Sequence, residues 1–414
     1  MTIEKRGVYN WRNFNASPLP VRGPVAKVKV DDETWRDGMQ GTHLSKHPST
    51  EARKLYVATA AGLGYIDHLD IGFPASGLQQ RNQLVDIISF SQRERHGVTF
   101  SAAGRAAARG DVEAIVDVSL RTGVPLEADL FFDASTIRAE VEGWDRKAMI
   151  RKVAENIRYA NKYGLPVMFV PERASETHPE ELFEVCRIAA EAGADRIAIA
   201  DTTGVLTPTA TRNLFRGFFD TVGREHPTIA IDFHEHEDLG MGAGNCLVAV
   251  EEGVERLHAT ARGVGERPGN VKLEKLLVLL DLEGYRNVDT SKLQLYTQMA
   301  ADLLAVPIRP HEPIVGPEST STASGVHAST YGKGGEELPP VYFPFDPKAV
   351  GLEPHIRIGP MSGAANVHGF CREMGIDGIT DADVQTLLGV AKERWALLSR
   401  NDVLSILGRT ELEA

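Results

Sequence analysis

The chain has 414 residues, of which 42% are apolar and 25% charged, and its formal net charge is −12. This length and composition predict a globular protein of two or three domains. The negative charge argues against a general nucleic-acid binder, which would carry a basic face. No apolar run approaches the ~20 residues that are needed to cross a membrane, so we expect no membrane span.

The N-terminal residues 1–23 contain neither the apolar segment nor the cleavage pattern of a signal peptide. The three cysteines, Cys186, Cys246 and Cys371, are widely spaced and odd in number. They predict reduced thiols instead of a disulfide framework. Together these features predict a cytoplasmic protein.

Short β-rich segments alternate with longer helical patterns through the first part of the chain. Helical patterns lie, for example, at 147–163 and 179–192; the second begins after Thr177-His-Pro and ends at Gly193. We predict strands at 26–30, 65–71, 98–102, 126–132, 166–170, 195–200, 228–234 and 256–260. Eight such units within ~260 residues predict an α/β fold, a (β/α)8 TIM barrel, with a doubly wound sheet as the alternative.

The pattern changes after about residue 284. Helices are predicted at 291–304, 364–374 and 381–398, and residues 306–350 are rich in Pro, Gly, Ser and Thr. We therefore expect a catalytic barrel with an N-terminal arm at 1–284 and mostly helical C-terminal subdomains at 285–414. An irregular stretch of this length is uncommon in a compact protein unless it has a function. We expect the C-terminal part to carry function or to contact a second subunit.

Polar residues collect just after the predicted strands. His234-Glu235-His236 ends the seventh strand, and residues two apart on a strand face the same side, so both imidazoles can bind one divalent metal. The other polar residues at strand ends are Arg36, Asp37, Asp70, Arg105, Glu172, Asp201, Thr202 and Asn270. In a TIM barrel these positions share the C-terminal face, where active sites lie. Loops are polar in general, so the placement supports an active site and does not decide the matter.

Four motifs of the predicted barrel resemble the DRE-TIM metallolyase superfamily. They are Asp32-Glu-Thr-Trp-Arg-Asp-Gly-Met-Gln40, Ile71-Gly-Phe-Pro-Ala-Ser76, His234-Glu-His-Glu-Asp-Leu-Gly240 and Gly263-Val-Gly-Glu-Arg-Pro-Gly-Asn270. Two later segments, Ser324-Gly-Val-His327 and Tyr342-Phe-Pro-Phe-Asp-Pro347, are similar to segments of the 2-isopropylmalate, homocitrate and citramalate synthases. The resemblance runs from about residue 27 to 376 and is much less specific for the substrate than for the superfamily.

The resemblance implies a divalent metal (Mg, Mn or Zn) that is held by Asp37, His234, His236 and Asn270. Such a site suits a 2-oxo acid, whose ketone the metal would polarise as a Lewis acid. Arg36 is then expected to stabilise the developing alkoxide. The implied reaction joins acetyl-CoA to the 2-oxo acid and releases free CoA. A surface ion pair is the alternative role of Arg36 and Asp37.

Catalytic roles are also implied for Glu172, His327 and Tyr342. In the synthases the tail of one subunit reaches the barrel of its partner, so the resemblance implies a homodimer with tail exchange. His327 and Tyr342 are expected to enolise the acetyl thioester or to assist the hydrolysis that follows. Thr202 is expected to bind the substrate carboxylate, although a helix N-cap would also explain it. The complete set of expected substrate-binding residues is Gln40, Asp70, Ser76, Arg105, Asp129, Ser135, Val170 and Thr202.

Several positions depart from the family pattern. Glu237 replaces the Asn of H-x-H-N-D, Asp129 stands where isopropylmalate synthases have a pocket histidine, and Arg173 follows Glu172 in place of Asp. A carboxylate at Asp129 would repel a second carboxylate on the substrate in a desolvated pocket. We therefore expect a 2-oxo acid with a neutral or cationic side chain, unless Arg105 or Arg173 compensates.

Two other functions remain open. One is a carbon–carbon lyase of the same superfamily, similar to hydroxymethylglutaryl-CoA lyase. That lyase has a Cys in a Gly-rich loop and lacks the long tail, whereas the loop at 263–270 has no Cys here. The other is a non-catalytic, metal-dependent binder of small molecules, against which the presence of Arg36, His327 and Tyr342 argues.

Overall fold

The computed structural model describes residues 27–44, 47–334 and 341–410. These residues form two compact units. The first comprises the described residues up to Asp289 together with Tyr296–Pro307. The second comprises Thr290–Leu295 and the described residues from Ile308 onward.

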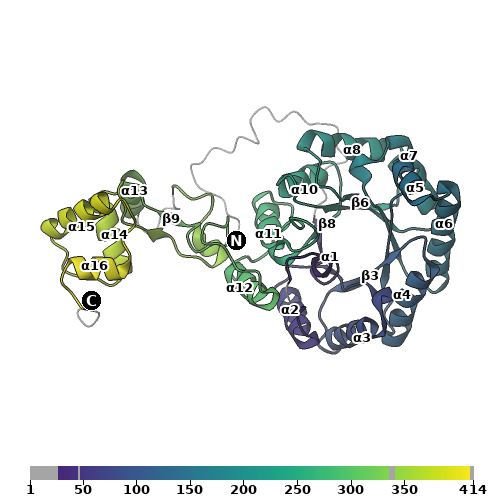
Figure 1. The fold of residues 1–414 in the computed structure, drawn as a ribbon, viewed down its shortest axis with the longest axis horizontal. Coiled ribbons are helices and arrows are strands. Elements are labelled where there is room, and N and C mark those ends of the chain that lie inside the picture. The colour runs from purple at the N-terminus through teal and green to yellow at the C-terminus, as the bar shows by residue number, and fades with distance from the viewer. Residues whose placement is uncertain (1–26, 45–46, 335–340, 411–414) are drawn as a thin grey trace. The chain divides into compact units, whose positions relative to one another are not determined.

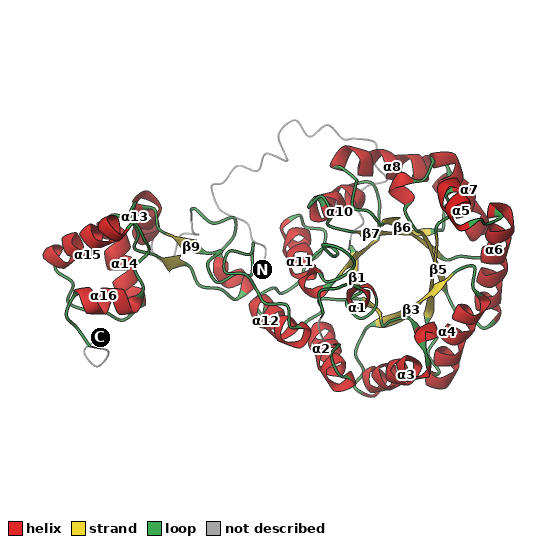
Figure 2. Cartoon of the chain, viewed as in Figure 1, coloured by secondary structure: helices red, strands yellow, loops and turns green. Residues whose placement is uncertain are grey.

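Eight parallel strands form a closed barrel in the first unit (Figure 2). They are β1 (Lys29–Asp32), β2 (His68–Asp70), β3 (Thr99–Arg105), β4 (Glu127–Phe132), β5 (Val167–Pro171), β6 (Arg196–Asp201), β7 (Ala230–Glu235) and β8 (Arg256–Ala259). β1 pairs with β8, with Lys29 opposite Arg256, and this pairing closes the sheet. The closure confirms the predicted TIM barrel and shows that the doubly wound alternative was wrong. All eight predicted strands are present, although Ala26, at the start of the first, lies outside the described residues.

Helices surround the barrel (Figure 1). They are α1 (Asp37–Gln40), α2 (Thr50–Gly62), α3 (Leu78–Arg93), α4 (Arg109–Thr122), α5 (Thr136–Glu142), α6 (Arg146–Lys162), α7 (Pro179–Ala192), α8 (Pro208–Asp220), α9 (Val222–Glu225), α10 (Gly242–Glu251), α11 (Leu273–Leu282) and α12 (Leu293–Leu304), with short 3₁₀ turns η2 (Pro74–Ser76), η3 (Ala174–Glu176) and η4 (Ala261–Gly263). α7 has the predicted bounds. Pro179 fits the first turn of a helix, and Gly193 ends the helix with a left-handed φ of 102°.

Alternate strand residues face the surrounding helices or the barrel interior. Outward-facing residues are apolar; for example, the rings of Phe233 on β7 and Phe215 on α8 lie 5.2 Å apart. Part of the interior holds a small apolar cluster that includes Met168 and Val170 of β5 and Ala198 of β6. The rest is densely charged. The charged residues of the strands face inward. For this reason polar side chains from distant segments of the chain meet inside the barrel.

The second unit has a small core of its own, built around Phe370, Leu387 and Val403. Its elements are β9 (Ser321–Thr322), α13 (Gly325–Gly334), η5 (Pro347–Val350), β10 (His355–Ile356), α14 (Ala364–Glu373), α15 (Asp381–Arg394) and α16 (Arg400–Ile406), and β9 pairs with β10. The predicted helices at 364–374 and 381–398 are present, the second ending earlier because Trp395 adopts a left-handed φ of 50°. α13 and α16 were not predicted.

No described helix is long and apolar enough to cross a membrane. The three cysteines are free and buried. Burial raises the pKa of the Cys371 thiol to about 11, and the pKa values of the other two thiols are also raised by burial. These thiols therefore pack as small apolar groups, in keeping with the reduced state that was predicted.

Candidate active site

The two histidines at the end of β7 point their ring nitrogens at one another. The Nε2 atoms of His234 and His236 lie 3.2 Å apart, and the two residues are only 6% and 3% exposed. The alternation of β7 places both side chains on the interior side, as predicted. Burial lowers the pKa of His236 to about 4, so its imidazole is neutral near pH 7 and presents a lone pair.

Asp37 and Asn270 come to the same place from opposite ends of the barrel sequence. One carboxylate oxygen of Asp37, the first residue of α1, lies within 4.8 Å of ring nitrogens of both histidines. The side chain of Asn270 donates from Nδ2 to Asp37 Oδ2 at 2.5 Å. The backbone of Asn270 pairs with that of His236 in an isolated antiparallel bridge. Gly265, at φ 153°, passes so close that a Cβ atom would lie 2.1 Å from Asn270 Nδ2. Glycine is therefore required there.

These four residues fit a divalent cation. Two metal–nitrogen bonds of about 2.1 Å at 90–109° place the nitrogens about 3.0–3.4 Å apart, a range that includes the observed separation of His234 and His236. The Oδ1 atom of Asn270 is buried and has no hydrogen-bond partner among the described residues. Burial alone would raise the pKa of Asp37, but Arg36 and the imidazoles hold it below its usual range. A negative carboxylate, two imidazole nitrogens and an unsatisfied amide oxygen form a suitable ligand set.

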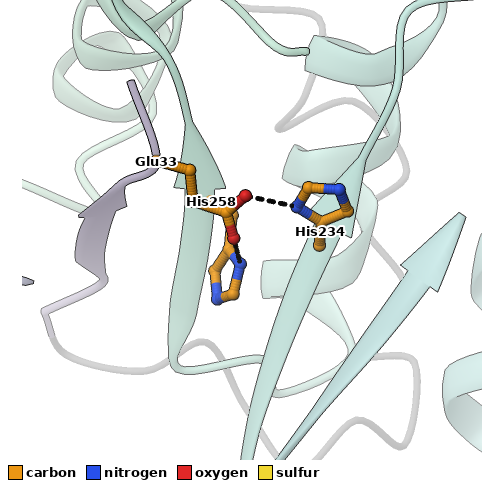
Figure 3. A group of neighbouring side chains, drawn as sticks. All are labelled: Glu33, His234 and His258. Atoms are coloured by element: carbon orange, nitrogen blue, oxygen red, sulfur yellow. Dashed lines mark hydrogen bonds and ion pairs between the residues drawn. The ribbon is translucent and has the colours of Figure 1, made fainter. Parts of the chain in front are cut away.

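Glu33 is the residue of this region that sequence reasoning missed. Figure 3 shows its carboxylate between two imidazoles: Oε2 lies 3.1 Å from His234 Nδ1, and Oε1 lies 2.6 Å from His258 Nδ1. Oε2 also accepts a hydrogen bond from Arg36 Nη2 at 2.6 Å. A carboxylate at Nδ1 favours the tautomer of His234 that carries its proton there, which leaves the Nε2 lone pair for a metal.

His258 belongs to a charge network and not to a metal site. Its Nδ1 faces Glu33, and its Nε2 lies 3.1 Å from Asp232 Oδ2. Although burial lowers the pKa of His258, the carboxylates around it raise the pKa well above its usual value. A protonated imidazole with both nitrogens engaged has no lone pair for a cation. The cluster of Glu33, His234 and His258 thus orients His234 and does not form a second ligand set.

Arg36 lies among four carboxyl groups. It contacts Glu33 at 2.6 Å, Asp70 at 2.9 Å, Asp37 at 3.1 Å and Asp129 at 3.9 Å. Burial, together with the neighbouring Asp70, raises the pKa of Asp129 well above its usual value, and burial also raises that of Asp70. One proton between these two buried carboxyls satisfies both. The negative charge that was assumed at Asp129 is thereby largely removed.

The remaining predicted pocket residues occupy varied environments. Arg105 pairs with Asp111 at 2.7 Å and is mostly exposed, and Ser135 caps α5 by accepting from Arg138 N at 3.2 Å. Ser76 contacts Gln80. The set also includes Gln40, which is exposed at the end of α1, and Val170, which is buried in the barrel interior.

Thr202 and Glu172 lie in neighbouring loops after β6 and β5. Thr202 Oγ1 accepts a hydrogen bond from Arg173 N at 2.8 Å. It does not cap the following helix, because Thr207 is the N-cap of α8. Glu172 is half-buried, and burial followed by the nearby Asp133 raises its pKa. A carboxyl group with a raised pKa is suited to proton transfer.

His327 and Tyr342 meet in the second unit. Their rings stack with centroids 3.8 Å apart and an interplanar angle of 17°. They border a cavity of about 60 Å³ together with Ser321, Thr322, Tyr331 and Phe343. The two residues that were assigned to the reaction from separate motifs therefore form one pair.

Fold and site together define a TIM barrel with a candidate divalent-metal site at its C-terminal mouth. A family model described as HMGL-like matches residues 27–302. The chain belongs to this family, in the branch that contains 2-isopropylmalate and homocitrate synthases.

The relatives are similar over most of the chain. The 2-isopropylmalate synthase of Sulfolobus acidocaldarius is 31% identical over 372 residues, which are 89% of this chain and 90% of that protein. The homocitrate synthase of Sulfurisphaera tokodaii is 31% identical over 331 residues, 77% of this chain and 67% of that protein. Among solved structures, the HMG-CoA lyase of Bacillus subtilis has a TM-score of 0.57 at 18% identity and covers 69% of this chain and 96% of its own. At that identity the likeness shows the fold alone.

Proposed function

We propose that the protein catalyses a metal-dependent condensation of acetyl-CoA with a 2-oxo acid, giving a 2-alkylmalate-type product and free CoA. The observation that carries this proposal is the convergence of Asp37, His234 and His236 beside Arg36, in a chain of the synthase branch. The enzyme is an acyltransferase in which the acyl group becomes an alkyl group on transfer. The cytoplasm is the proposed compartment.

The metal is the first element of the proposed mechanism. Asp37, His234 and His236 would hold it, with Asn270 as the fourth ligand or directly behind the other three. Four carboxyl groups surround one guanidinium here, so even with one proton shared between Asp70 and Asp129 the site has an excess of negative charge, which a dication offsets. Bound Mg, Mn or Zn supplies a Lewis acid for the ketone of the 2-oxo acid.

The chain's own residues position the substrate and its charges. The guanidinium of Arg36 contacts Asp37 directly and so lies next to the ligand set, where negative charge develops on the former ketone oxygen. Thr202 uses an oxygen lone pair for Arg173 N, which leaves its O–H to donate to the substrate carboxylate. Glu172 is the proposed proton carrier on the barrel side, because its pKa is raised.

His327 and Tyr342 are the proposed acid–base pair for the acetyl group. We propose a homodimer in which residues 285–414 of one subunit contact the partner and bring this pair to its barrel. An imidazole can take a proton from the acetyl methyl carbon or activate the water that releases CoA. The stacked pair beside a small cavity supports a shared role for the two residues.

The side chain of the 2-oxo acid is proposed to be neutral. Arg105 pairs with Asp111, and Arg173 lies 3.6 Å from Asp133 and 3.3 Å from Glu176. Neither arginine is left to compensate a second substrate carboxylate. The expected preference for a neutral side chain therefore follows from the ion pairs of Arg105 and Arg173, and it does not require a negative charge at Asp129.

The carbon–carbon lyase and the non-catalytic binder are the competing functions. The loop at 263–270 contains no cysteine, and the three cysteines of the chain lie in α7, α10 and α14. No thiol of the described residues is therefore placed at the metal site for lyase chemistry. The stacking of His327 on Tyr342 argues against a mere binder, since ligand binding alone does not need an acid–base pair.

One assay separates the three functions. The metal-loaded protein is offered acetyl-CoA with a panel of 2-oxo acids, and free CoA is detected with a thiol reagent. Release that depends on one 2-oxo acid, and is lost in His234→Ala, supports the synthase. Cleavage of hydroxymethylglutaryl-CoA without any condensation would support the lyase. Binding of a 2-oxo acid with neither reaction would leave the binder.

A further inference from the structure

A large pocket lies in the barrel unit beside the candidate metal site. Its volume is about 590 Å³, within the usual range of small-molecule sites. Arg36 and Gln40 line one part of it, and the first turns of α2 and α3 line another. These two helices are neighbours on the barrel's circumference (Figure 2). The pocket thus connects the candidate active site with two helix N-termini.

The lining of this pocket includes basic side chains and no carboxyl group; Arg36 is paired with carboxyl groups outside the lining, whereas Arg53 is not. In a chain with a net charge of −12, such a surface needs an explanation. The remaining polar lining is mainly amide and hydroxyl groups, which can donate hydrogen bonds. The basic residues and glutamines are Arg36, His47, Arg53, Gln40, Gln79, Gln80 and Gln83. This composition favours an anionic ligand.

Arg53 differs from every other buried arginine that the structure describes. Arg53, Arg256, Arg262 and Arg286 are each 4% exposed. The last three pair with the carboxylates of Asp232, Glu274 and Asp67, respectively. Arg53 has no carboxylate partner among the residues that the structure describes, and burial lowers its pKa. Burying a cation without an anion is costly, so this position is explained best by a ligand that supplies the anion.

The donors around Arg53 are also unsatisfied. Its Nε and Nη1 atoms are buried without a hydrogen bond among the described residues, and Nη2 has only the sulfur of Met39 at 3.8 Å. Trp35, whose ring lies 5.5 Å from the Arg53 guanidinium, has a buried indole N–H that likewise has no partner. Both residues line the pocket. Arg53 therefore offers unpaired donors at the pocket, and the fully buried Trp35 packs behind its guanidinium.

Two helix dipoles add to this potential. α2 begins at Thr50, directly after the pocket residues Pro48 and Ser49, and the Ser49 hydroxyl accepts a hydrogen bond from one of its first amides, Ala52 N, at 3.2 Å. α3 begins at Leu78 after Gly77, and no side chain caps its first turn. Helix N-termini attract anions through their free amides and their positive dipole ends.

We propose that this pocket binds a phosphate group, with Arg53 as its side-chain donor. The phosphate belongs either to the acyl-CoA co-substrate or to a free phosphate-bearing effector. The first source rests on the proposed function and places the thioester arm along the lining toward Arg36. The second source is independent of it.

Binding of inorganic phosphate tests the site without any assay of activity. Phosphate should raise the melting temperature of the wild type and of the control Lys54→Gln, in which the replaced lysine, next to Arg53 in sequence, pairs with Glu51 and Asp86. Arg53→Gln should weaken phosphate binding at least tenfold, whereas Arg53→Lys should retain part of it. Without phosphate, Arg53→Gln should melt no lower than the wild type, because the cation it removes is unpaired.

An unchanged phosphate response in Arg53→Gln would overturn the proposal. If that variant does not fold, Arg53→Lys is compared with the wild type instead. Phosphate binding that is equal in these two proteins, or absent from both, would overturn the proposal as well.

The source of the phosphate is identified by comparing acetyl-CoA with acetyl-pantetheine, which lacks phosphate groups. If the co-substrate supplies it, Arg53→Gln raises the KM for acetyl-CoA at least tenfold and leaves that for acetyl-pantetheine unchanged. If an effector supplies it, both KM values stay the same while the phosphate response is lost. A protein that binds phosphate through Arg53 but releases no thiol contradicts the proposed function and leaves this site intact.

Discussion

The barrel interior contains two clusters of buried ionisable groups that differ in how their charges are balanced. The first residues of the even-numbered strands, His68, Glu127, Arg196 and Arg256, form a floor network with Asp232 and Asp31. In it, Arg256 contacts Glu127 and Asp232 at 2.5 Å each, and Arg196 contacts Asp232 at 2.5 Å. Opposite charges there largely neutralise one another.

The mouth, formed by Arg36, Asp37, His234, His236 and Asn270, has no such balance. Carboxyl groups outnumber the single guanidinium, and the amide oxygen of Asn270 and Nδ1 of His236 are buried without partners. Glu33 and His258 connect the two clusters. The comparison teaches that charge density does not distinguish the candidate site from its surroundings. Nor do unsatisfied atoms alone, because both carboxylate oxygens of Asp31 and Nε2 of His68 in the floor network also lack hydrogen-bond partners among the described residues. What distinguishes the mouth is that ligand atoms of Asp37, His234 and His236 lie within 4.8 Å of one another, as the ligands of one cation must.

The largest effect is expected from removing a mouth ligand. His234→Ala should lose its bound divalent metal and at least about a thousandfold in thiol release, because Lewis-acid stabilisation is worth several kcal/mol. Elemental analysis and the thiol assay measure the two losses. His226→Ala, which removes a histidine outside every cluster of metal-ligating residues found in the structure, is the control. Equal metal content in the wild type and His234→Ala would remove the metal site from the proposal.

The next effect tests whether the mouth is completed by a second subunit. Arg36→Ala and His327→Ala should each be nearly inactive. After mixing and reassembly, activity should recover to about a quarter of the wild-type value, since half of the dimers are mixed and each has one intact site. Subunit exchange is verified with differently tagged chains. Proven exchange with no recovery would mean that each site is built from one chain.

A smaller effect separates the two clusters directly. Glu33→Gln should weaken metal binding about 10–100-fold, because the carboxylate that orients His234 is lost. Glu33→Asp should restore part of that affinity. Asp232→Asn in the floor network should instead lower the free energy of unfolding by about 3 kcal/mol, since it leaves Arg196 and Arg256 without their shared carboxylate.

The readouts of these variants are metal affinity by titration and unfolding by urea. Metal affinity in Asp232→Asn should stay within about threefold of the wild type, because a connecting imidazole transmits little of the change. If the floor variant weakened metal binding as much as Glu33→Gln, the two clusters would act as one site, and the distinction between them would be wrong.

The sequence allowed the barrel and part of its mouth to be predicted, because those features are local. Strand periodicity, the Pro179 and Gly193 signals of α7, and the alternation of His234 and His236 are all readable within a few residues. Glu33 was overlooked although it shares a strand face with Asp31. Its partner His258 is 225 residues away in sequence, and only the closure of β1 against β8 brings them together.

The missed features of the other regions have similar causes. Arg53 is notable only because no carboxylate reaches it, and a missing partner cannot be read from a sequence. α16 did carry a signal, since Ser399 and Asp402 form a reciprocal cap at its start. α13 lies in a stretch rich in Gly and Ser that predicted irregular structure, so packing and not intrinsic propensity explains it.

The smallest expected effect concerns Asp31, the carboxyl group of the floor network whose pKa is raised. Burial raises the pKa of Asp31 from 3.8 to about 8, an increase that Arg256 and His258 only partly offset. Below about pH 4 this carboxyl is protonated in both the folded and the unfolded chain, so it does not change stability. Between pH 4 and pH 8 the unfolded chain releases the proton while the folded chain keeps it, and stability falls as pH rises. Asp31→Asn lacks this proton, so its free energy of unfolding relative to the wild type should be about 2 kcal/mol higher at pH 6.5 than at pH 5. Urea unfolding of both proteins at the two pH values measures the difference.

If Asp31→Asn and the wild type differed in stability by the same amount at both pH values, Asp31 would be ionised by Arg256. The floor network would then be a fully charged cluster that differs from the mouth only in how its charges are paired.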